Sequence, residues 1–138
     1  MNKEHVMQAT VTWQKDMLFD CETDSGKTLQ LDGNGEQLTP METVLLSVGA
    51  CSSVDVVEIM KKSRLPLRSC RCELKATRAE SAPKVFTDIH AEYVVSGEKI
   101  SDKHLARAVQ LSCEKYCSVM LMLAGNVNIT TSYRVEEL

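Results

Sequence analysis

Hydrophobic and polar residues alternate in several segments of the chain. Between these segments, apolar residues recur at helical spacing. Alternation of this kind is typical of strands with one buried face. The predicted strands cover residues 7–13, 17–22, 28–31, 70–77, 85–95 and 127–135. A turn at Asp24-Ser25-Gly26 separates the second and third strands, and the glycine-rich stretch 32–35 ends this N-terminal meander.

The strongest helix signal begins at Thr39. Thr39 is a good N-cap, Pro40 suits the first helical position, and Glu42 completes a T-x-x-E capping box. We expect this helix to continue to about Lys62, before Pro66 stops it.

Apolar residues cover nearly the whole circumference of the first half of this helix, which is typical of a buried helix. Small residues occupy positions 47 and 49–53, and Gly49 costs about 1 kcal/mol against alanine in a helix interior. We therefore expect close backbone approach at this belt. One small sheet cannot cover such a helix, so the sequence predicts an intertwined homodimer.

A second helix is predicted over residues 101–117, capped by Ser101-Asp102, and a short buried helix over 119–123. The element order is then β-β-β-α-β-β-α-α-β. This order predicts an α+β fold with antiparallel sheets, and the length of 138 residues fits a single domain over 1–138.

Composition excludes several classes of function. The net charge is −3 and aromatic residues make up 4%, which disfavours binding to nucleic acid. The longest clean apolar run covers only residues 119–125, so we expect no membrane association. The start of the chain, Met1–His5, lacks the apolar region of a signal peptide, which predicts a cytoplasmic protein.

Six cysteines offer candidate chemistry, and in a reducing cytoplasm they should be thiols. Cys51 lies within the small-residue belt, and Cys117 lies where the second helix meets the short helix. Cys113 is expected one turn before Cys117 on the same face. On spacing alone, the favoured interpretation of Cys51 and Cys117 is that each fills space as a small buried hydrophobe. The cysteines are Cys21, Cys51, Cys70, Cys72, Cys113 and Cys117.

A metal site finds little support in the sequence. Cys70 and Cys72 share one face of a strand, but no second pair accompanies them at metal-ligand spacing. The histidines, His5, His90 and His104, are isolated from one another. We expect neither a metal nor a cofactor.

Two sequence segments resemble the OsmC/Ohr family of organic-hydroperoxide reductases. The run from Thr39 to Cys51 matches the family's pattern of proline, glutamate, an apolar run, small residues and a reactive cysteine. The run from Ser112 to Val119 falls where the family keeps its other cysteine, and the separation of the two cysteines also matches. The pieces Lys-Tyr-Cys-Ser and Cys-Ser-Ser-Val-Asp-Val-Val resemble a YhfA-like branch of this family.

The resemblance implies a thiol peroxidase acting in oxidative-stress defence. Cys51 would attack an organic hydroperoxide and become a sulfenic acid, and Cys117 would resolve it as a disulfide. An external dithiol would then reduce that disulfide. The family's carboxylate corresponds to Glu42. The resemblance also implies the family fold, in which sheets wrap a long central helix.

Helix geometry adds a constraint on Glu42. It lies nine residues before Cys51, which corresponds to about 13.5 Å of rise and a rotation of about 180°. The two side chains cannot meet within one helix. If both serve one site, Glu42 must come from the partner subunit; alternatively it acts only in the capping box.

One family feature is missing. No arginine precedes Arg64, whereas the catalytic arginine of the family lies in the N-terminal strand region. A reactive thiolate needs a nearby cation, and Asp55, one turn beyond Cys51, would act in the opposite sense. Lys27, Arg64, Arg68 or a partner chain could supply the cation. The alternative function is a homodimeric small-ligand-binding protein with weak or no peroxidase activity.

Overall fold

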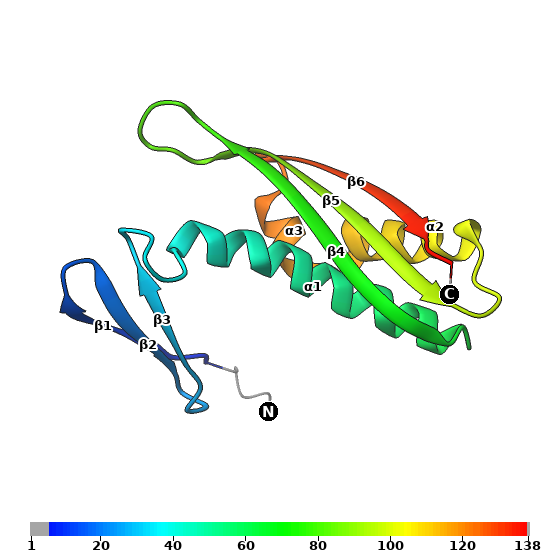
Figure 1. Ribbon diagram of the computed structural model, residues 1–138, viewed down its shortest axis with the longest axis horizontal. Coiled ribbons are helices and arrows are strands. Elements are labelled where there is room, and N and C mark those ends of the chain that lie inside the picture. Colours follow the sequence, from blue (N-terminus) through cyan, green and yellow to red (C-terminus); the bar gives the residue numbers. More distant parts are fainter. Residues whose placement is uncertain (1–5, 138) are drawn as a thin grey trace. The chain divides into compact units, whose positions relative to one another are not determined.

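The computed structural model describes residues 6–137, so the predicted absence of a leader at Met1–His5 concerns residues outside this range. The chain divides into two compact units, one ending at Val44 and the other beginning at Leu45. Each unit contains one three-stranded sheet (Figure 1). The mixed α+β class predicted from the sequence is confirmed.

The first unit is built on an antiparallel sheet with the strand order β1-β2-β3, as the predicted meander requires. A left-handed residue, Asp16, turns the chain between the first two strands, and Gly26, with φ of 83°, lies in the next turn. Glycine adopts that conformation without steric cost. The strands are β1 (Ala9–Lys15), β2 (Leu18–Thr23) and β3 (Thr28–Asp32).

One face of this first sheet is apolar. The strand register aligns Val11, Cys21 and Leu29 in one cross-strand row, and a second row follows beside it. Val11 is 63% exposed and Leu29 is 44% exposed. Covering an apolar face of this kind stabilises a sheet. The second row consists of Trp13, Phe19 and Leu31.

The long helix α1 (Pro40–Lys62) begins as its sequence predicts. The Thr39 hydroxyl accepts the amide of Glu42 at 3.1 Å, and the Glu42 carboxylate accepts the amide of Thr39 at 2.9 Å. This reciprocal pair satisfies two amides that would otherwise lack partners at the start of the helix. The predicted capping box is confirmed.

Close backbone approach in the small-residue belt is also confirmed. A Cβ atom added to Gly49 would lie 2.8 Å from Leu74 Cδ1 and 3.7 Å from Cys72 Sγ. Both neighbours belong to β4 (Leu67–Arg78), which therefore passes directly over α1 at this point. Only a residue without a side chain lets helix and strand pack this closely.

Gly49→Val should destabilise the protein by about 1–3 kcal/mol, because the added methyl groups overpack the contact with β4. Lys61→Val is the matched control, since it places the same side chain at an exposed position of the same helix. We expect the control to stay within about 0.5 kcal/mol of the parent. Urea unfolding curves measure both; equal midpoints for the two variants would contradict the close contact.

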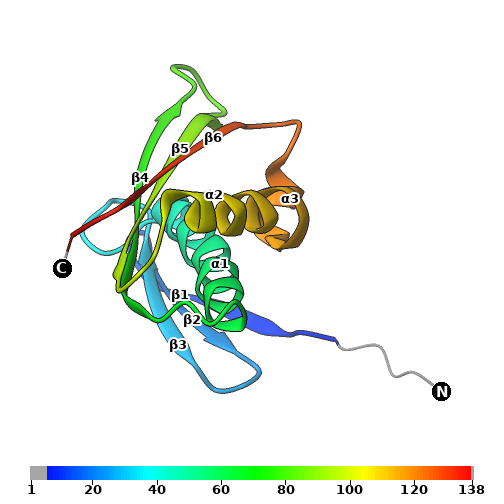
Figure 2. The same ribbon diagram turned by 90° about the vertical axis from the view of Figure 1, so that its right-hand side faces the viewer.

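The second unit packs helices against one side of a sheet with the strand order β4-β5-β6 (Figure 2). Inward side chains of β5 and of the helix α2 form much of its core, with Ile89, Tyr93 and Leu105 almost completely buried. The remaining elements are β5 (Phe86–Gly97), α2 (Asp102–Leu111), the π-helical turn η1 (Ser112–Tyr116), α3 (Ser118–Leu123) and β6 (Asn128–Val135).

One strand pairing differs from the antiparallel expectation. The strands β4 and β5 pair antiparallel across the predicted connection, but β5 and β6 run parallel, with Ile89 opposite Ile129. A long connection through α2, η1 and α3 separates them, and a crossover of that length permits parallel pairing. Alternation within a strand reports its faces and carries no information about the direction of its neighbour.

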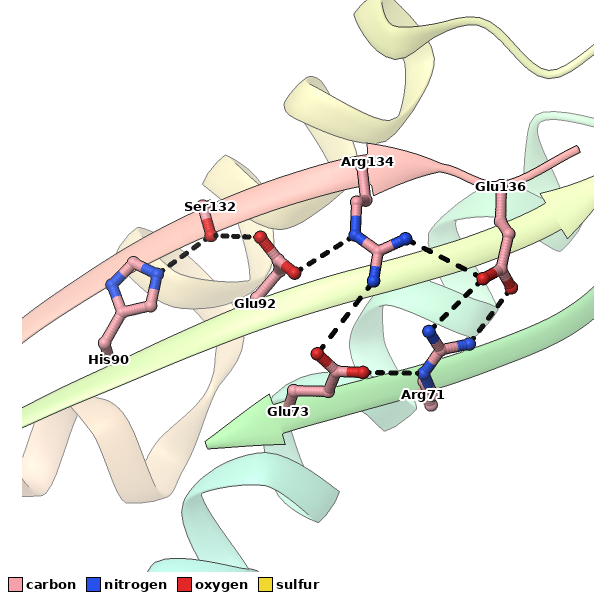
Figure 3. A network of polar contacts seen from close by, with 7 residues as sticks. All are labelled: Arg71, Glu73, His90, Glu92, Ser132, Arg134 and Glu136. Carbon is pink, nitrogen blue, oxygen red and sulfur yellow. Dashed lines mark hydrogen bonds and ion pairs between the residues drawn. The ribbon is translucent and has the colours of Figure 1, made fainter. Parts of the chain in front are cut away.

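A network of polar side chains ties the three strands of this sheet together (Figure 3). Arg71 on β4 bonds Glu136, which follows β6, at 3.0 Å, and Arg134 on β6 bonds Glu92 on β5 at 3.2 Å. These bonds lower the pKa of Glu136 and of Glu92. Exposed pairs contribute at most about 1 kcal/mol each, so the network mainly favours this strand register.

Two helix expectations need correction. The short helix α3 is not buried throughout, since Met122 is 72% exposed while Met120 is buried. In addition, α1 is long and apolar enough to cross a membrane by length and composition, although polar residues interrupt its apolar runs. Core helices of folded domains pass the same test, and Val48, Val56 and Met60 of α1 are buried here.

Candidate functional site

The two cysteines singled out by the sequence lie in contact. Cys51, in the middle of α1, is partly exposed, whereas Cys117, between η1 and α3, is completely buried. Cys51 is among the groups that shift the pKa of the Cys117 thiol, so the two side chains are neighbours within the second unit. Residues far apart along the chain thus form a dithiol pair in which only one member faces solvent.

A π-helical turn positions Cys117. The amide of Cys117 donates to the carbonyl of Ser112 at 2.7 Å, which closes the wide turn of η1. Cys117 itself leaves the helix, with φ −73° and ψ 106°. A π-turn inserts an extra residue into a helix and is often found at functional sites. Here it places the buried thiol against α1.

This turn also corrects the expected relation between Cys113 and Cys117. A regular α-helix would place both thiols on one face, one turn apart. In the structure Cys113 Sγ lies 3.6 Å from the hydroxyl of Tyr93 on β5, whereas Cys117 contacts Cys51 on α1. The extra residue of η1 therefore directs the two thiols to different neighbours.

Burial determines the protonation of Cys117. Removal from water, with a smaller contribution from the neighbouring Cys51, raises the pKa of the Cys117 thiol to about 11, although the amide of Met120 opposes the shift. The thiolate is the nucleophilic form of cysteine. At neutral pH Cys117 therefore stays a thiol, unsuited to attack a substrate first but able to close a disulfide with a neighbour.

A second group of thiols surrounds Tyr93. Its hydroxyl donates to Ser52 Oγ at 2.6 Å and is hydrogen-bonded to Cys113 Sγ, and Tyr93 also influences the pKa of the neighbouring Cys72. Burial raises the pKa of Tyr93 and of Cys113, and raises that of Cys72 to about 11. Neither Tyr93 nor Ser52 was predicted from the sequence as a functional residue. The inward position of Tyr93 in an alternating strand was the available signal.

The carboxylates near this region have separate partners. Asp55 accepts a hydrogen bond from the Ser112 hydroxyl at 3.2 Å, and Glu42 is occupied in the capping box at the start of α1. The nine-residue separation on α1 still prevents Glu42 from meeting Cys51 within one subunit.

None of the main causes of the Cys117 pKa shift is a cation. Arg64 and Arg68 both follow the end of α1 at Lys62, about 16 Å of helix beyond Cys51. No set of three or more His, Cys, Asp and Glu side chains within residues 6–137 is arranged to hold a metal ion.

The buried thiols should make the protein less stable at high pH. In the unfolded chain thiols ionise near pH 8.5, whereas Cys72 and Cys117 in the folded protein ionise near about 11. The folded state therefore holds more protons between these values, so stability present below about pH 8.5 is lost as pH rises toward 11.

Urea unfolding at pH 8 and pH 10.5 measures this loss. A variant carrying Cys72→Ala and Cys117→Ala should lose less stability over that interval than the parent. Cys21→Ala, on the first sheet, serves as the control and should follow the parent. Parallel pH profiles for the parent and the double variant would contradict the assignment.

An α+β scaffold that presents one half-exposed and one buried thiol to each other defines a class of dithiol domain. Residues 33–132 match the family described as OsmC-like protein. Protein YhfA of Escherichia coli K12 is 47% identical over 131 residues, which cover 94% of this chain and 98% of that protein. The chain therefore belongs to the OsmC-like protein family.

Solved structures agree with this assignment. A hypothetical protein from Aquifex aeolicus is 35% identical, with a TM-score of 0.89 over 98% of this chain and 99% of that one. An organic hydroperoxide resistance protein OsmC from Legionella pneumophila is 15% identical, with a TM-score of 0.73 over 97% and 100%. At that identity the likeness shows the shared fold.

Proposed function

We propose that this protein reduces organic hydroperoxides through Cys51 and Cys117. The observation that carries the proposal is the contact between a half-exposed and a buried thiol. A substrate can approach Cys51, while Cys117 is held out of its reach and stays protonated. Membership of a family that includes organic hydroperoxide resistance proteins supports the substrate class.

The proposed reaction proceeds in three steps. The Cys51 thiolate attacks the outer peroxide oxygen, the O–O bond breaks, and the alkoxide leaves as an alcohol after taking a proton, so that Cys51 becomes a sulfenic acid. The sulfur of Cys117 then attacks Cys51 Sγ, which forms the disulfide and releases water. An external dithiol exchanges with this disulfide, becomes oxidised itself, and returns both thiols.

We further infer that the working form is a homodimer. The apolar face of the first sheet is exposed, and so are Leu46 and Val54 on α1, at 54% and 58%. Exposed apolar surface that includes strand and helix faces of one chain is typical of an interface with a second copy. The chain's own Glu42 cannot reach Cys51 along α1. In the proposed dimer, Glu42 of the partner subunit would take that place.

Within this proposal the partner subunit also supplies the missing positive charge. The role of Glu42 would be to orient the peroxide or the cation. A cytoplasmic location, with thiols maintained in the reduced state, fits six free cysteines. The single-domain organisation over residues 1–138 is part of the same proposal.

The alternative, a ligand-binding protein without efficient turnover, is favoured by the absence of an arginine before Arg64. Steady-state consumption of tert-butyl hydroperoxide in the presence of dithiothreitol distinguishes the two. The proposal predicts many turnovers per Cys51. Consumption no faster than that of the fully alkylated protein would leave only the binding function.

A further inference from the structure

Ser112 stands at the junction between the two thiols and has no part in the steps above. It is completely buried, and its hydroxyl donates to the backbone carbonyl of Ser52 at 2.8 Å, with Asp55 Oδ2 as a second acceptor at 3.2 Å. Ser52 directly follows Cys51. The carbonyl of Ser112 accepts the amide of Cys117. One residue therefore links the backbone beside Cys51 to the backbone of Cys117.

A second contact strengthens this link. Tyr93 donates its hydroxyl hydrogen to Ser52 Oγ, which in turn donates to the carbonyl of Val48 at 2.7 Å. The oxygen of Tyr93 then remains as an acceptor for the thiol of Cys113. Consecutive residues of η1, Ser112 and Cys113, are thus both fastened to Ser52, one directly and one through Tyr93.

The consequence concerns the geometry of disulfide closure. Two sulfurs must come within about 2.05 Å with a defined torsion angle, so small displacements of either backbone slow the reaction. The turn η1 lacks regular α-helical hydrogen bonding and depends on outside contacts to fix its position. Ser112 supplies a buried contact of this kind on the side of η1 that faces α1.

We propose that Ser112 is a positioning residue that holds Cys117 in register with Cys51 for disulfide closure. This inference rests on the proposed function for its biological meaning, but its geometric content does not depend on peroxide chemistry. Ser112 touches neither substrate nor the reacting sulfurs. Its loss should slow the second step of the cycle and leave the attack by Cys51 unchanged.

Diamide, a chemical oxidant of dithiols, tests the position of the sulfurs without any peroxide. It first adds to one thiol, and the second thiol then displaces it to give the disulfide and a hydrazine. We expect Ser112→Ala to close the Cys51–Cys117 disulfide about tenfold more slowly than wild type, which is the effect of losing one buried hydrogen bond. The rate at which iodoacetamide alkylates Cys51 in this variant should stay within about twofold of the wild-type rate.

Ser132→Ala is the matched control. Ser132 also donates a hydrogen bond, to Glu92 at 3.1 Å, but it belongs to the polar network shown in Figure 3 and has no contact with either thiol. The Ser132→Ala variant should close the Cys51–Cys117 disulfide at the wild-type rate. A merely structural role for Ser112 would lower stability without changing the ratio of closure rate to Cys51 alkylation rate.

The outcomes are separable. Wild-type closure rates in Ser112→Ala would overturn the positioning role. If Ser112→Ala does not fold, Tyr93→Phe removes the second link, and wild-type closure in that variant would overturn the inference in the same way. If Ser112→Ala closes the disulfide slowly with diamide while wild type does not react with hydroperoxide, the positioning role is supported and the proposed function is refuted. Failure of wild type to close with diamide would refute both.

Discussion

Replacing Cys51 with serine is expected to abolish hydroperoxide reduction, lowering kcat/KM by at least about a thousandfold. A serine hydroxyl is not ionised at neutral pH and cannot replace the thiolate. The same substitution at Cys117 should have a different effect, because Cys117 acts only after the peroxide bond has broken. Cys117→Ser should still convert one equivalent of hydroperoxide to alcohol and then stop at the Cys51 sulfenic acid.

Stopped-flow measurement of hydroperoxide loss, followed by trapping with dimedone and mass mapping, separates the two variants. A dimedone adduct on Cys51 should accumulate in Cys117→Ser and be scarce in wild type. Cys21→Ser, which alters a thiol of the first sheet, should react as wild type does. If the Cys51 and Cys117 variants both failed to consume the first equivalent of hydroperoxide, the division of roles derived from the exposure of the two thiols would be contradicted.

Mixed dimers should recover activity that neither parent variant has. Glu42→Gln keeps the capping box, because glutamine also serves at that position, but removes the carboxylate charge. If Glu42 of one subunit serves Cys51 of the other, a mixed dimer of Glu42→Gln and Cys51→Ser contains one intact site and one doubly altered site. Equal mixing gives half mixed dimers, and thus about a quarter of wild-type activity.

The measurement is kcat/KM after co-expression of the two variants with different affinity tags and purification through both. Dimers purified in this way should have about half of wild-type activity, since every one is mixed. The control is a dimer in which one subunit carries both substitutions and the other is wild type. Each of its two sites then contains one substitution, so it should have little activity. An inactive Glu42→Gln parent with no recovery in the first mixture would contradict action of Glu42 on the other subunit, and a fully active Glu42→Gln parent would place Glu42 outside the site.

Local signals in the sequence were sufficient for much of this fold. The capping box at Thr39 and Glu42 fixed the start of α1, because the residues that satisfy its first amides are adjacent in sequence. Gly49 indicated the close contact with β4, because a mid-helix glycine carries an energetic cost that packing must offset.

Nonlocal features were not predictable in the same way. The parallel pairing of β5 and β6 depends on where the crossover returns the chain, which alternation does not encode. The π-turn at Ser112–Tyr116 has an ordinary helical sequence, so Cys113 was expected beside Cys117. The thiol pair itself was predicted from resemblance to a family, since spacing alone favoured two cysteines that only fill space in the core.

The central claim is that Cys51 reacts and Cys117 closes the disulfide within one subunit. Reduced wild-type protein is treated with one equivalent of tert-butyl hydroperoxide, quenched in acid with an alkylating agent, and mapped by mass spectrometry without reduction. The account predicts a Cys51–Cys117 disulfide that leaves the subunits separable on a denaturing gel. Free, alkylated Cys51 and Cys117, or a disulfide joining other cysteines or different subunits, would contradict it.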